Sequence, residues 1–145
     1  MNEVELKYNE LDVDTYLALR SQVQWKLLGK EQAEAALRNS LFIVTAYLDH
    51  ACVGMGRLVG DGAVICYVQD LIVLPQAQGK GIGSKVLTAL KQKAEEFRME
   101  NTEMMLCLMC AKGREVFYES HGFLARPTAQ LGPGMIQYLG TPLDK

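Results

Sequence analysis

The sequence predicts one α/β domain, in which antiparallel strand hairpins come first and a β-α-β unit lies in the middle. Two patterns indicate this fold class. Between residues 41 and 74, β-rich segments alternate with tight turns, and the last of them leads through a short loop into a long amphipathic helix. A length of 145 residues is the usual size of one domain, so we expect one folding unit over 1–145.

The amino-terminal segment predicts one strand and two helices. Residues Glu3 to Tyr8 alternate polar and apolar side chains, as a half-buried strand does. Asp14 can cap a helix that ends at Gly29, and a second short helix runs from about Glu31 to Asn39. In the first helix we expect three side chains to face outward: Arg20, Gln22 and Lys26.

Three strands are expected next. Leu41 to Leu48 and Ala51 to Val59 form a hairpin around Asp49-His50, and Gly60-Asp61-Gly62 makes another tight turn. Ala63 to Leu74 is almost continuously apolar, which is typical of a central strand covered on both faces.

The β-α-β unit follows from this central strand. Pro75 ends the strand, because proline cannot donate to a ladder. An amphipathic helix from about Gly81 to Arg98 leads to a strand at Glu103 to Cys110. A further helix, from about Arg114 to His121, ends at Gly122.

Two more strands are expected near the carboxyl terminus. Phe123-Leu124-Ala125 begins one, and Met135 to Leu139 forms the last, after a loop at Arg126 to Gly134. The last strand is compatible with a homodimer interface and equally with an edge strand inside one domain.

Charge and hydropathy narrow the class of partner. A net charge of −2 and a pI near 5.7 argue against nucleic-acid or anionic-membrane binding, which usually needs a basic face. Charged residues interrupt any signal-peptide core near the amino terminus, and no apolar run approaches the roughly 18 residues that span a bilayer. We therefore expect a cytoplasmic protein without a nucleic-acid or membrane partner.

The four cysteines predict no metal site. Cys107 and Cys110 form a C-x-x-C pair within an apolar segment expected to be a buried strand, where residues three apart point to opposite faces. Cys52 and Cys66 do not supply the second close pair of a tetrahedral zinc site. Buried free thiols are the preferred interpretation.

A glycine-spaced loop, Gln78 to Ser84, lies where the central strand gives way to the helix. Such a loop exposes backbone N–H groups at a helix N-terminus, where the macrodipole favours an anion such as pyrophosphate. The P-loop spacing fails, because Leu74 stands where the first glycine should be and Gly81 where Ser or Thr should be. The dinucleotide spacing G-x-G-x-x-G fails at Ser84.

The spacing Q-x-x-G-x-G is met by Gln78, Gly81 and Gly83, and there the chain resembles the GNAT family of N-acetyltransferases. The resemblance extends over the strand, proline, loop and helix around that loop. It recurs at Phe117 to Phe123, which is similar to the family's F-Y-x-x-x-G-F segment, and the order of elements from Glu3 to Leu139 is also the family's.

The resemblance implies a coenzyme A site and acetyl-CoA as co-substrate, without a metal. Loop N–H groups would bind the pyrophosphate, with glycine leaving room for the phosphates to approach the backbone. The resemblance also implies that the preceding strand splays from its neighbour, so that its backbone groups bind the pantetheine arm and polarise the thioester carbonyl. The implied cofactor-binding residues are Leu71, Ile72, Val73, Gln78, Gly79, Lys80, Gly81, Ile82, Gly83 and Ser84.

Two residues are candidates for proton transfer. Tyr118 stands where the family often has a tyrosine general acid, and a phenol pKa near 10 is close enough to that of a thiol for proton transfer to the departing thiolate. Asp70, an acid in an otherwise apolar strand, is the candidate base for the acceptor amine. Ala111 and Arg114 depart from the family's usual asparagine and alanine, which removes one expected pantetheine contact.

The function predicted from these residues is direct acetyl transfer from acetyl-CoA to a primary amine in a ternary complex. The acceptor, a small molecule or a peptide, is not readable from the sequence. Two alternatives stay open: a non-catalytic domain that binds acetyl-CoA as a sensor, and a nucleotide-binding oxidoreductase.

Overall fold

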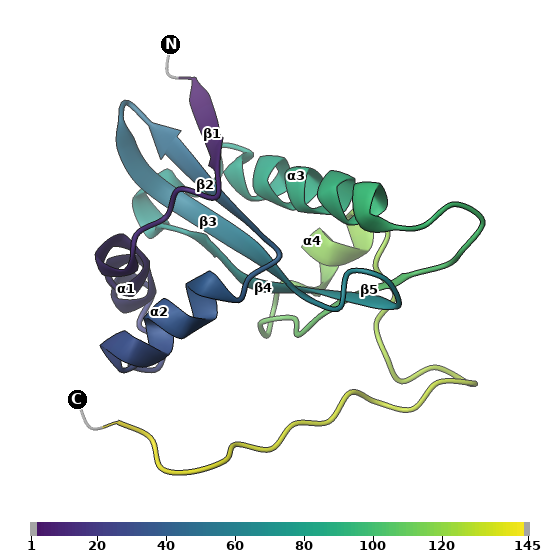
Figure 1. The fold of residues 1–145 in the computed structure, drawn as a ribbon. Coiled ribbons are helices and arrows are strands. Elements are labelled where there is room, and N and C mark those ends of the chain that lie inside the picture. The colour runs from purple at the N-terminus through teal and green to yellow at the C-terminus, as the bar shows by residue number, and fades with distance from the viewer. Residues whose placement is uncertain (1–2, 144–145) are drawn as a thin grey trace.

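The computed structural model describes residues 3–143 and shows a sheet with helices on both faces (Figure 1). The strands are β1 (Val4–Tyr8), β2 (Phe42–Leu48), β3 (Ala51–Gly60), β4 (Ile65–Val73) and β5 (Met105–Leu108). The helices are α1 (Val13–Gln22), α2 (Lys30–Arg38), α3 (Ile82–Phe97) and α4 (Glu115–Ser120), and a short 3-10 turn, η1 (Pro75–Ala77), precedes α3. This mixed architecture confirms the predicted fold class.

The strands lie in the sheet in their sequence order, β1-β2-β3-β4-β5. The first three neighbouring pairs are antiparallel, and β4 and β5 are parallel. The β2–β3 hairpin turns at Asp49 and His50, whose φ angles of 52° and 67° suit the right-handed twist of the two strands. The parallel pair needs a crossover, and α3 supplies it, as the β-α-β prediction required.

Helix α3 packs closely against one face of the sheet. Its stripe of buried residues includes Val86, Leu87 and Leu90, which join side chains of β2, β3 and β4 in an apolar core. β3 contributes Gly56 at the crossing point, where a Cβ would lie 2.8 Å from Cδ1 of Leu90. The absence of a side chain at Gly56 therefore allows the helix to approach the sheet.

Helices α1 and α2 cover the opposite face (Figure 1). Tyr16 and Leu19 of α1 and Ala33 of α2 are buried there against Met55 of β3 and Ile72 of β4. The sheet thus separates two cores, and β4 contributes side chains to both, as expected of a central strand.

Helix α1 begins and ends earlier than the sequence predicted. Its N-cap is Asp12, whose Oδ1 accepts a hydrogen bond from the Thr15 N–H at 2.8 Å, so the choice of Asp14 was wrong. Asp14 lies in the first turn, where an acid suits the helix dipole. Gly29 does not end α1 but is the N-cap of α2.

The two strands expected after α4 are absent from the described residues. Residues 123–125 and 135–139 have no ladder partner, and the chain after α4 runs as an extended segment along the edge of the molecule (Figure 1). An apolar, β-prone sequence becomes a strand only where a neighbouring strand accepts its hydrogen bonds. β5 is also shorter than predicted, and Cys110 beyond it is exposed instead of buried.

No helix within residues 3–143 has the length and apolar character needed to cross a bilayer.

Candidate functional site

β4 and β5 pair over only part of their length and then separate. The ladder runs from Ile65 opposite Met105 to Val68 opposite Leu108, whereas β4 continues along β3 as far as Val73. Residues 71–73 therefore have no strand on the side of β5 in the described structure. This confirms the splay expected at Leu71, Ile72 and Val73. We name the divergence of β4 and β5 beyond Val68 and Leu108 the opening.

A β-bulge lies at the start of this opening. Gly56 of β3 faces two residues of β4, Asp70 and Leu71, and Asp70 has a φ of 55°. The left-handed conformation is tolerated by aspartate more readily than by most residues. Because of the bulge, Leu71 packs against the α3 core while Asp70 points toward α1.

The loop before α3 presents a row of backbone donors. Gly81 is the N-cap of α3, and the first helical hydrogen bond runs from the Lys85 N–H to the Gly81 carbonyl at 3.1 Å. Within residues 3–143, no backbone acceptor pairs with the N–H groups from Gly79 to Ser84. Together with the positive end of the dipole of a 16-residue helix, these donors form a site suited to an anion.

Glycine occupies the three positions of the loop for different physical reasons. Gly79 and Gly81 have φ angles of 81° and 78°, and a Cβ on either would meet no atom within 4 Å. At Gly83, in contrast, a Cβ would lie 3.4 Å from Cζ of Phe117. Open space thus lies beside Gly79 and Gly81, whereas the missing side chain at Gly83 allows α4 to pack on α3. Phosphate binding at these glycines stays a prediction.

Gln78 connects the loop to the end of β4. Its side-chain amide donates to the Val73 carbonyl at 3.0 Å, and its backbone N–H donates to the Pro75 carbonyl at 3.3 Å. Both groups are therefore used within the chain, so the geometry supports a role for Gln78 in shaping the loop more than in direct contact with a phosphate.

A polar contact joins α3 to the end of α4. Ser84 Oγ lies 3.1 Å from Nε2 of His121, the C-cap residue of α4, and Lys91 Nζ donates to the His121 carbonyl. The cation at that helix end matches the negative end of the α4 dipole. The loop that Ser84 borders is thereby held against the helix that carries Tyr118.

Tyr118 is half-buried on the α3 side of the sheet. Its ring meets Phe117 and Phe123 edge-on, with centroids 5.1 Å and 6.0 Å away. Burial raises the pKa of the phenol above its ordinary value, the neighbouring Cys110 raises it further, and Arg114 opposes the rise. Since Cys110 lies two residues after β5, Tyr118 stands near the carboxyl end of β5.

Arg114 and Ala111 lie at the turn between β5 and α4. Arg114 is exposed, with its guanidinium carbon 5.5 Å from the centroid of the Phe117 ring, and its N–H donates to the Ala111 carbonyl at 3.0 Å. Neither Ala111 nor Arg114 has a side-chain amide. The pantetheine contact expected from the family's usual asparagine is therefore missing from this chain.

Asp70 is the centre of a buried charged cluster. Its Oδ1 accepts from Arg20 Nη1 at 3.0 Å and its Oδ2 from Arg57 Nε at 2.8 Å, and the Tyr16 hydroxyl also donates to Oδ2. The Asp70 side chain is 1% exposed. Burial and the charge of Asp70 raise the pKa of the Tyr16 phenol, so Tyr16 stays a donor. We name Asp70, Arg20, Arg57 and Tyr16 the Asp70 cluster.

The Asp70 cluster differs from what the sequence suggested. Arg20 faces inward and not outward, and both Asp70 oxygens already accept hydrogen bonds from cluster members. Asp70 as a general base stays a prediction, and these contacts argue against it. The sequence does contain one indication of this pairing. Arg57 is a lone charge in the apolar β3 segment, as Asp70 is in β4, and a buried charge is costly unless a group of opposite charge pairs with it.

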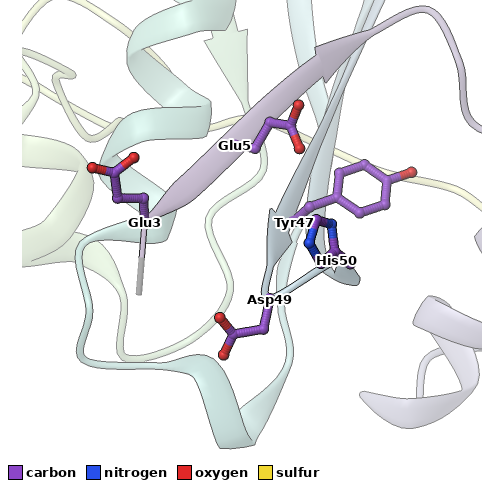
Figure 2. A pocket seen from close by; sticks show the side chains of 5 residues that line it. All are labelled: Glu3, Glu5, Tyr47, Asp49 and His50. Carbon is purple, nitrogen blue, oxygen red and sulfur yellow. The ribbon is translucent and has the colours of Figure 1, made fainter. Parts of the chain in front are cut away.

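A surface hollow of about 150 Å³ lies at the end of the β2–β3 hairpin (Figure 2). It is lined by Glu3, just before β1, and by Glu5, Tyr47, Asp49 and His50 of β1, β2 and the turn. Three acids and one histidine line it, but it includes no candidate of the β4–β5 opening. In residues 3–143 no group of three metal-ligating side chains comes together.

The α/β fold, the opening between two parallel strands and the donor row at the start of α3 define the class of protein: an acetyltransferase-type fold. The chain belongs to the GNAT family, because the family model described as an acetyltransferase (GNAT) domain matches residues 38–124. That range extends from the last residue of α2 to the residues just after α4 and contains the opening, the loop and Tyr118.

Solved structures agree with the family. A probable acetyltransferase of unknown function from meticillin-resistant Staphylococcus aureus is 30% identical, with 94% of this chain and 100% of that chain covered and a TM-score of 0.81. A GNAT-family acetyltransferase from Streptococcus pneumoniae is 32% identical, with 95% and 98% covered and a TM-score of 0.77.

A third structure, an aminoglycoside N-acetyltransferase in complex with coenzyme A, shares the fold. It is 12% identical, with 100% of this chain and 97% of that chain covered and a TM-score of 0.62. No sequence among the curated proteins matches this chain.

Proposed function

We propose that the protein is an N-acetyltransferase that transfers the acetyl group of acetyl-CoA to a primary amine by direct attack in a ternary complex. The observation that carries the proposal is the coincidence of two features at one end of β4. The strand loses its β5 neighbour after Val68, and the donor row from Gly79 to Ser84 lies at the start of the helix that follows.

The donor row would bind the pyrophosphate of coenzyme A. Gly79, Lys80, Gly81, Ile82, Gly83 and Ser84 would each offer a backbone N–H. Positive φ angles at Gly79 and Gly81 turn the loop so that a phosphate can come close to the main chain, and the exposed Lys80 adds a cation beside it. Gln78 would act indirectly, through its bond to Val73.

The unpaired edge of β4 would bind the pantetheine arm. Leu71, Ile72 and Val73 would pair with its amides as a missing strand would, and one N–H would face the thioester oxygen. The amine nitrogen attacks the thioester carbon, the C–S bond breaks, and its electron pair leaves on sulfur. The Tyr118 hydroxyl would then give its proton to the thiolate, the amine proton would pass to water, and water would return a proton to the Tyr118 oxygen.

The Asp70 cluster would support the reaction without moving a proton. The hydrogen bonds from Tyr16, Arg20 and Arg57 to the Asp70 carboxylate would fix the bulge that turns the β4 edge toward the opening. Arg20 also donates to the Lys26 carbonyl at 3.0 Å, so the cluster holds the α1–α2 loop, which would help to shape the acceptor site because binding residues often lie on loops.

The reaction is tested by release of free coenzyme A thiol from acetyl-CoA in the presence of a panel of small amines and amino-terminal peptides. We expect amine-dependent release in the wild type. In Tyr118→Phe we expect kcat to fall on the order of 10²-fold or more, with acetyl-CoA affinity unchanged, because a general acid contributes 10²–10⁴. Acetyl-CoA binding without release for any amine would favour the sensor instead.

The loop is tested separately by coenzyme A affinity. Gly81→Val would be strained by its φ of 78° even without a ligand, so it cannot distinguish the two reasons for this glycine. Gly81→Asn is the sharper variant, because asparagine tolerates that conformation and only adds a side chain where the phosphate should lie. Affinity lost in Gly81→Asn, with its melting temperature retained, supports the site; affinity retained contradicts it.

A further inference from the structure

The Asp70 cluster contains one more positive charge than negative charge. Arg20 and Arg57 pair with Asp70 at 3.0 Å and 2.8 Å, and neither arginine forms an ion pair with a second acid among residues 3–143. The two arginine side chains are only 12% and 11% exposed. A charge held this far from water is costly unless a group of opposite charge compensates it. The cluster therefore has a largely buried positive charge that Asp70 alone does not balance.

Arg57 is the better satisfied of the two arginines. Its Nε donates to Asp70, and its Nη1 donates to Ser40 Oγ at 3.2 Å and to the Ala36 carbonyl at 3.4 Å. Ala36 lies in the last turn of α2, where the carbonyl groups carry a partial negative charge. Arg57 and Asp70 thus form a neutral pair whose cation has further partners at the end of α2.

Arg20 carries the charge that this neutral pair does not need. Its Nη1 donates to Asp70 and its Nη2 to the Lys26 carbonyl, at 3.0 Å each, but its Nε is buried and has no hydrogen-bond partner in the described part of the chain. Buried donors without an acceptor are rare in folded proteins, and each one calls for an explanation. The surplus charge and the unused donor therefore belong to the same side chain.

Arg20 lies close to the place where an acceptor would meet the thioester. Its partner Asp70 directly precedes Leu71, in the part of β4 that has no β5 neighbour in the described structure. A pyrophosphate at the start of α3 would place coenzyme A on the α3 side of the sheet, which leaves the α1 side for the amine (Figure 1). There the Trp25 ring of the α1–α2 loop borders Arg20, with its centroid 5.4 Å from the guanidinium carbon.

We propose that the acceptor is an amine that also carries a carboxylate, and that Arg20 binds this carboxylate while the amine attacks the thioester. One carboxylate balances the surplus charge, whereas a phosphate ester would bring about 1.5 to 2 negative charges and reverse it. The planar guanidinium also matches the two oxygens of a carboxylate. Amino acids are the simplest members of this class. The proposal rests on the acetyl transfer proposed above.

The first test uses the wild-type protein and matched pairs of acceptors. Each pair is an amino acid and its carboxamide, and the panel covers α-amino acids with different side chains, β-alanine and γ-aminobutyrate, with phosphoethanolamine as a separate arm. The value of kcat/KM for release of coenzyme A thiol is corrected for the fraction of neutral amine. We expect at least one amino acid to exceed its carboxamide by about 10- to 100-fold, the range that a hydrogen bond to a charged group supplies. No preference in any pair, or a preference for the phosphate, would overturn the proposal.

The second test assigns the preference to Arg20. Arg20→Met removes the surplus charge and leaves Asp70 paired with Arg57, so we expect a folded protein, which its melting temperature checks. The preference for the carboxylate should disappear. Arg20→Lys keeps a cation and should retain part of the preference, and it replaces Arg20→Met if that variant does not fold. Arg38→Met removes an exposed arginine of α2 and should leave the preference intact. A preference that persists in Arg20→Met would overturn the proposal.

A binding measurement separates this proposal from the proposed reaction. Titration calorimetry in the presence of coenzyme A compares the N-acetyl derivative of each amino acid with that of its carboxamide, neither of which has a free amine. We expect the carboxylate to bind more tightly to the wild type, and the difference to vanish in Arg20→Met. Such binding without turnover of any amine would support the carboxylate site and contradict acetyl transfer. Turnover without a carboxylate preference would overturn the carboxylate site and leave acetyl transfer intact.

Discussion

The two faces of the sheet are held together by different forces. On the α3 face the contacts are apolar, and Val86, Leu87 and Leu90 fill the space against the strands. On the α1 face an apolar core surrounds the Asp70 cluster, which joins α1 to β3 and β4 through charge. Stability on the α3 face depends on close packing of apolar side chains. On the α1 face, the folded state is strongly destabilised if one member of the cluster loses its charged partner.

The two faces of the sheet also contribute differently to the candidate functional site. The α3 face supplies the fixed geometry of the donor row, because a tightly packed helix keeps its N-terminus in place. The α1 face carries the α1–α2 loop, which we propose shapes the acceptor site. There the cluster also engages the Ser40 hydroxyl and the Ala36 carbonyl through Arg57 Nη1, at 3.2 Å and 3.4 Å. Directional bonds thus fix the α1 and α2 elements relative to the bulge.

The largest effect should come from breaking the Asp70 cluster. Asp70→Ala leaves two guanidinium groups, only 11% and 12% exposed, without their carboxylate. Removing one partner of a buried ion pair costs about 3–5 kcal/mol, so we expect a loss of this size in the free energy of unfolding, measured by urea titration. Glu96→Ala, which removes the partner of Lys93 in an exposed pair, is the control and should change little.

A compensating variant sharpens this prediction. Asp70→Leu combined with Arg20→Met and Arg57→Met removes all three charges and keeps apolar volume. Replacing a whole buried ionic cluster is often neutral, so most of the stability lost in Asp70→Ala should return. Stability that stays low would show that the cluster holds the bulge geometry itself.

The second-largest loss of stability is expected from a cavity in the apolar core on the α3 face. Leu90 is fully buried between α3 and the sheet, so Leu90→Ala deletes methyl groups and leaves a cavity. Such substitutions cost 2–5 kcal/mol, and we expect about 3 kcal/mol by urea titration, independent of salt. Leu124→Ala, at a residue 71% exposed, is the control. If Leu90→Ala cost no more than Leu124→Ala, the close approach at Gly56 would not reflect tight packing.

The sequence predicted the α3 face far better than the α1 face. The stripe of α3, the apolar β4 and the glycine loop are local patterns with a fixed period, so residues 63–98 could be assigned almost to the residue. The Asp70 cluster joins Asp70 to Tyr16 and Arg20, which lie 54 and 50 positions earlier in the chain. The bulge that aims Asp70 has no local sequence signature. Arg20 was placed outward because helical period alone cannot show which charge has a buried partner.

The carboxyl terminus shows a second limit of the same kind. Met135–Leu139 has the composition of a strand, yet no strand forms there in the described chain. Composition fixes what a segment can pair with, and a separate partner decides whether it pairs. That Tyr118 and the loop residues contact a ligand stays a prediction for a related reason. Such contacts depend on a separate molecule, as strand formation depends on a separate strand.

The smallest effect concerns the N-cap of α1. Asp12→Ala removes the acceptor of the Thr15 N–H, which should reduce stability by about 1 kcal/mol at neutral pH. Asp12→Asn keeps an acceptor and should retain most of the stability, and Asp14→Ala, outside the cap, should cost less than Asp12→Ala. A larger loss in Asp14→Ala would show that α1 begins where the sequence first suggested.

The same cap predicts a pH dependence. The hydrogen bond from Thr15 lowers the pKa of Asp12 below its ordinary value of 3.8. A group whose pKa is lowered on folding stabilises the folded state above its unfolded pKa, and that stabilisation is lost as the pH falls through the lowered, folded value. The difference in stability between the wild type and Asp12→Ala should therefore be full at neutral pH and shrink below about pH 4, in urea titrations repeated across that range.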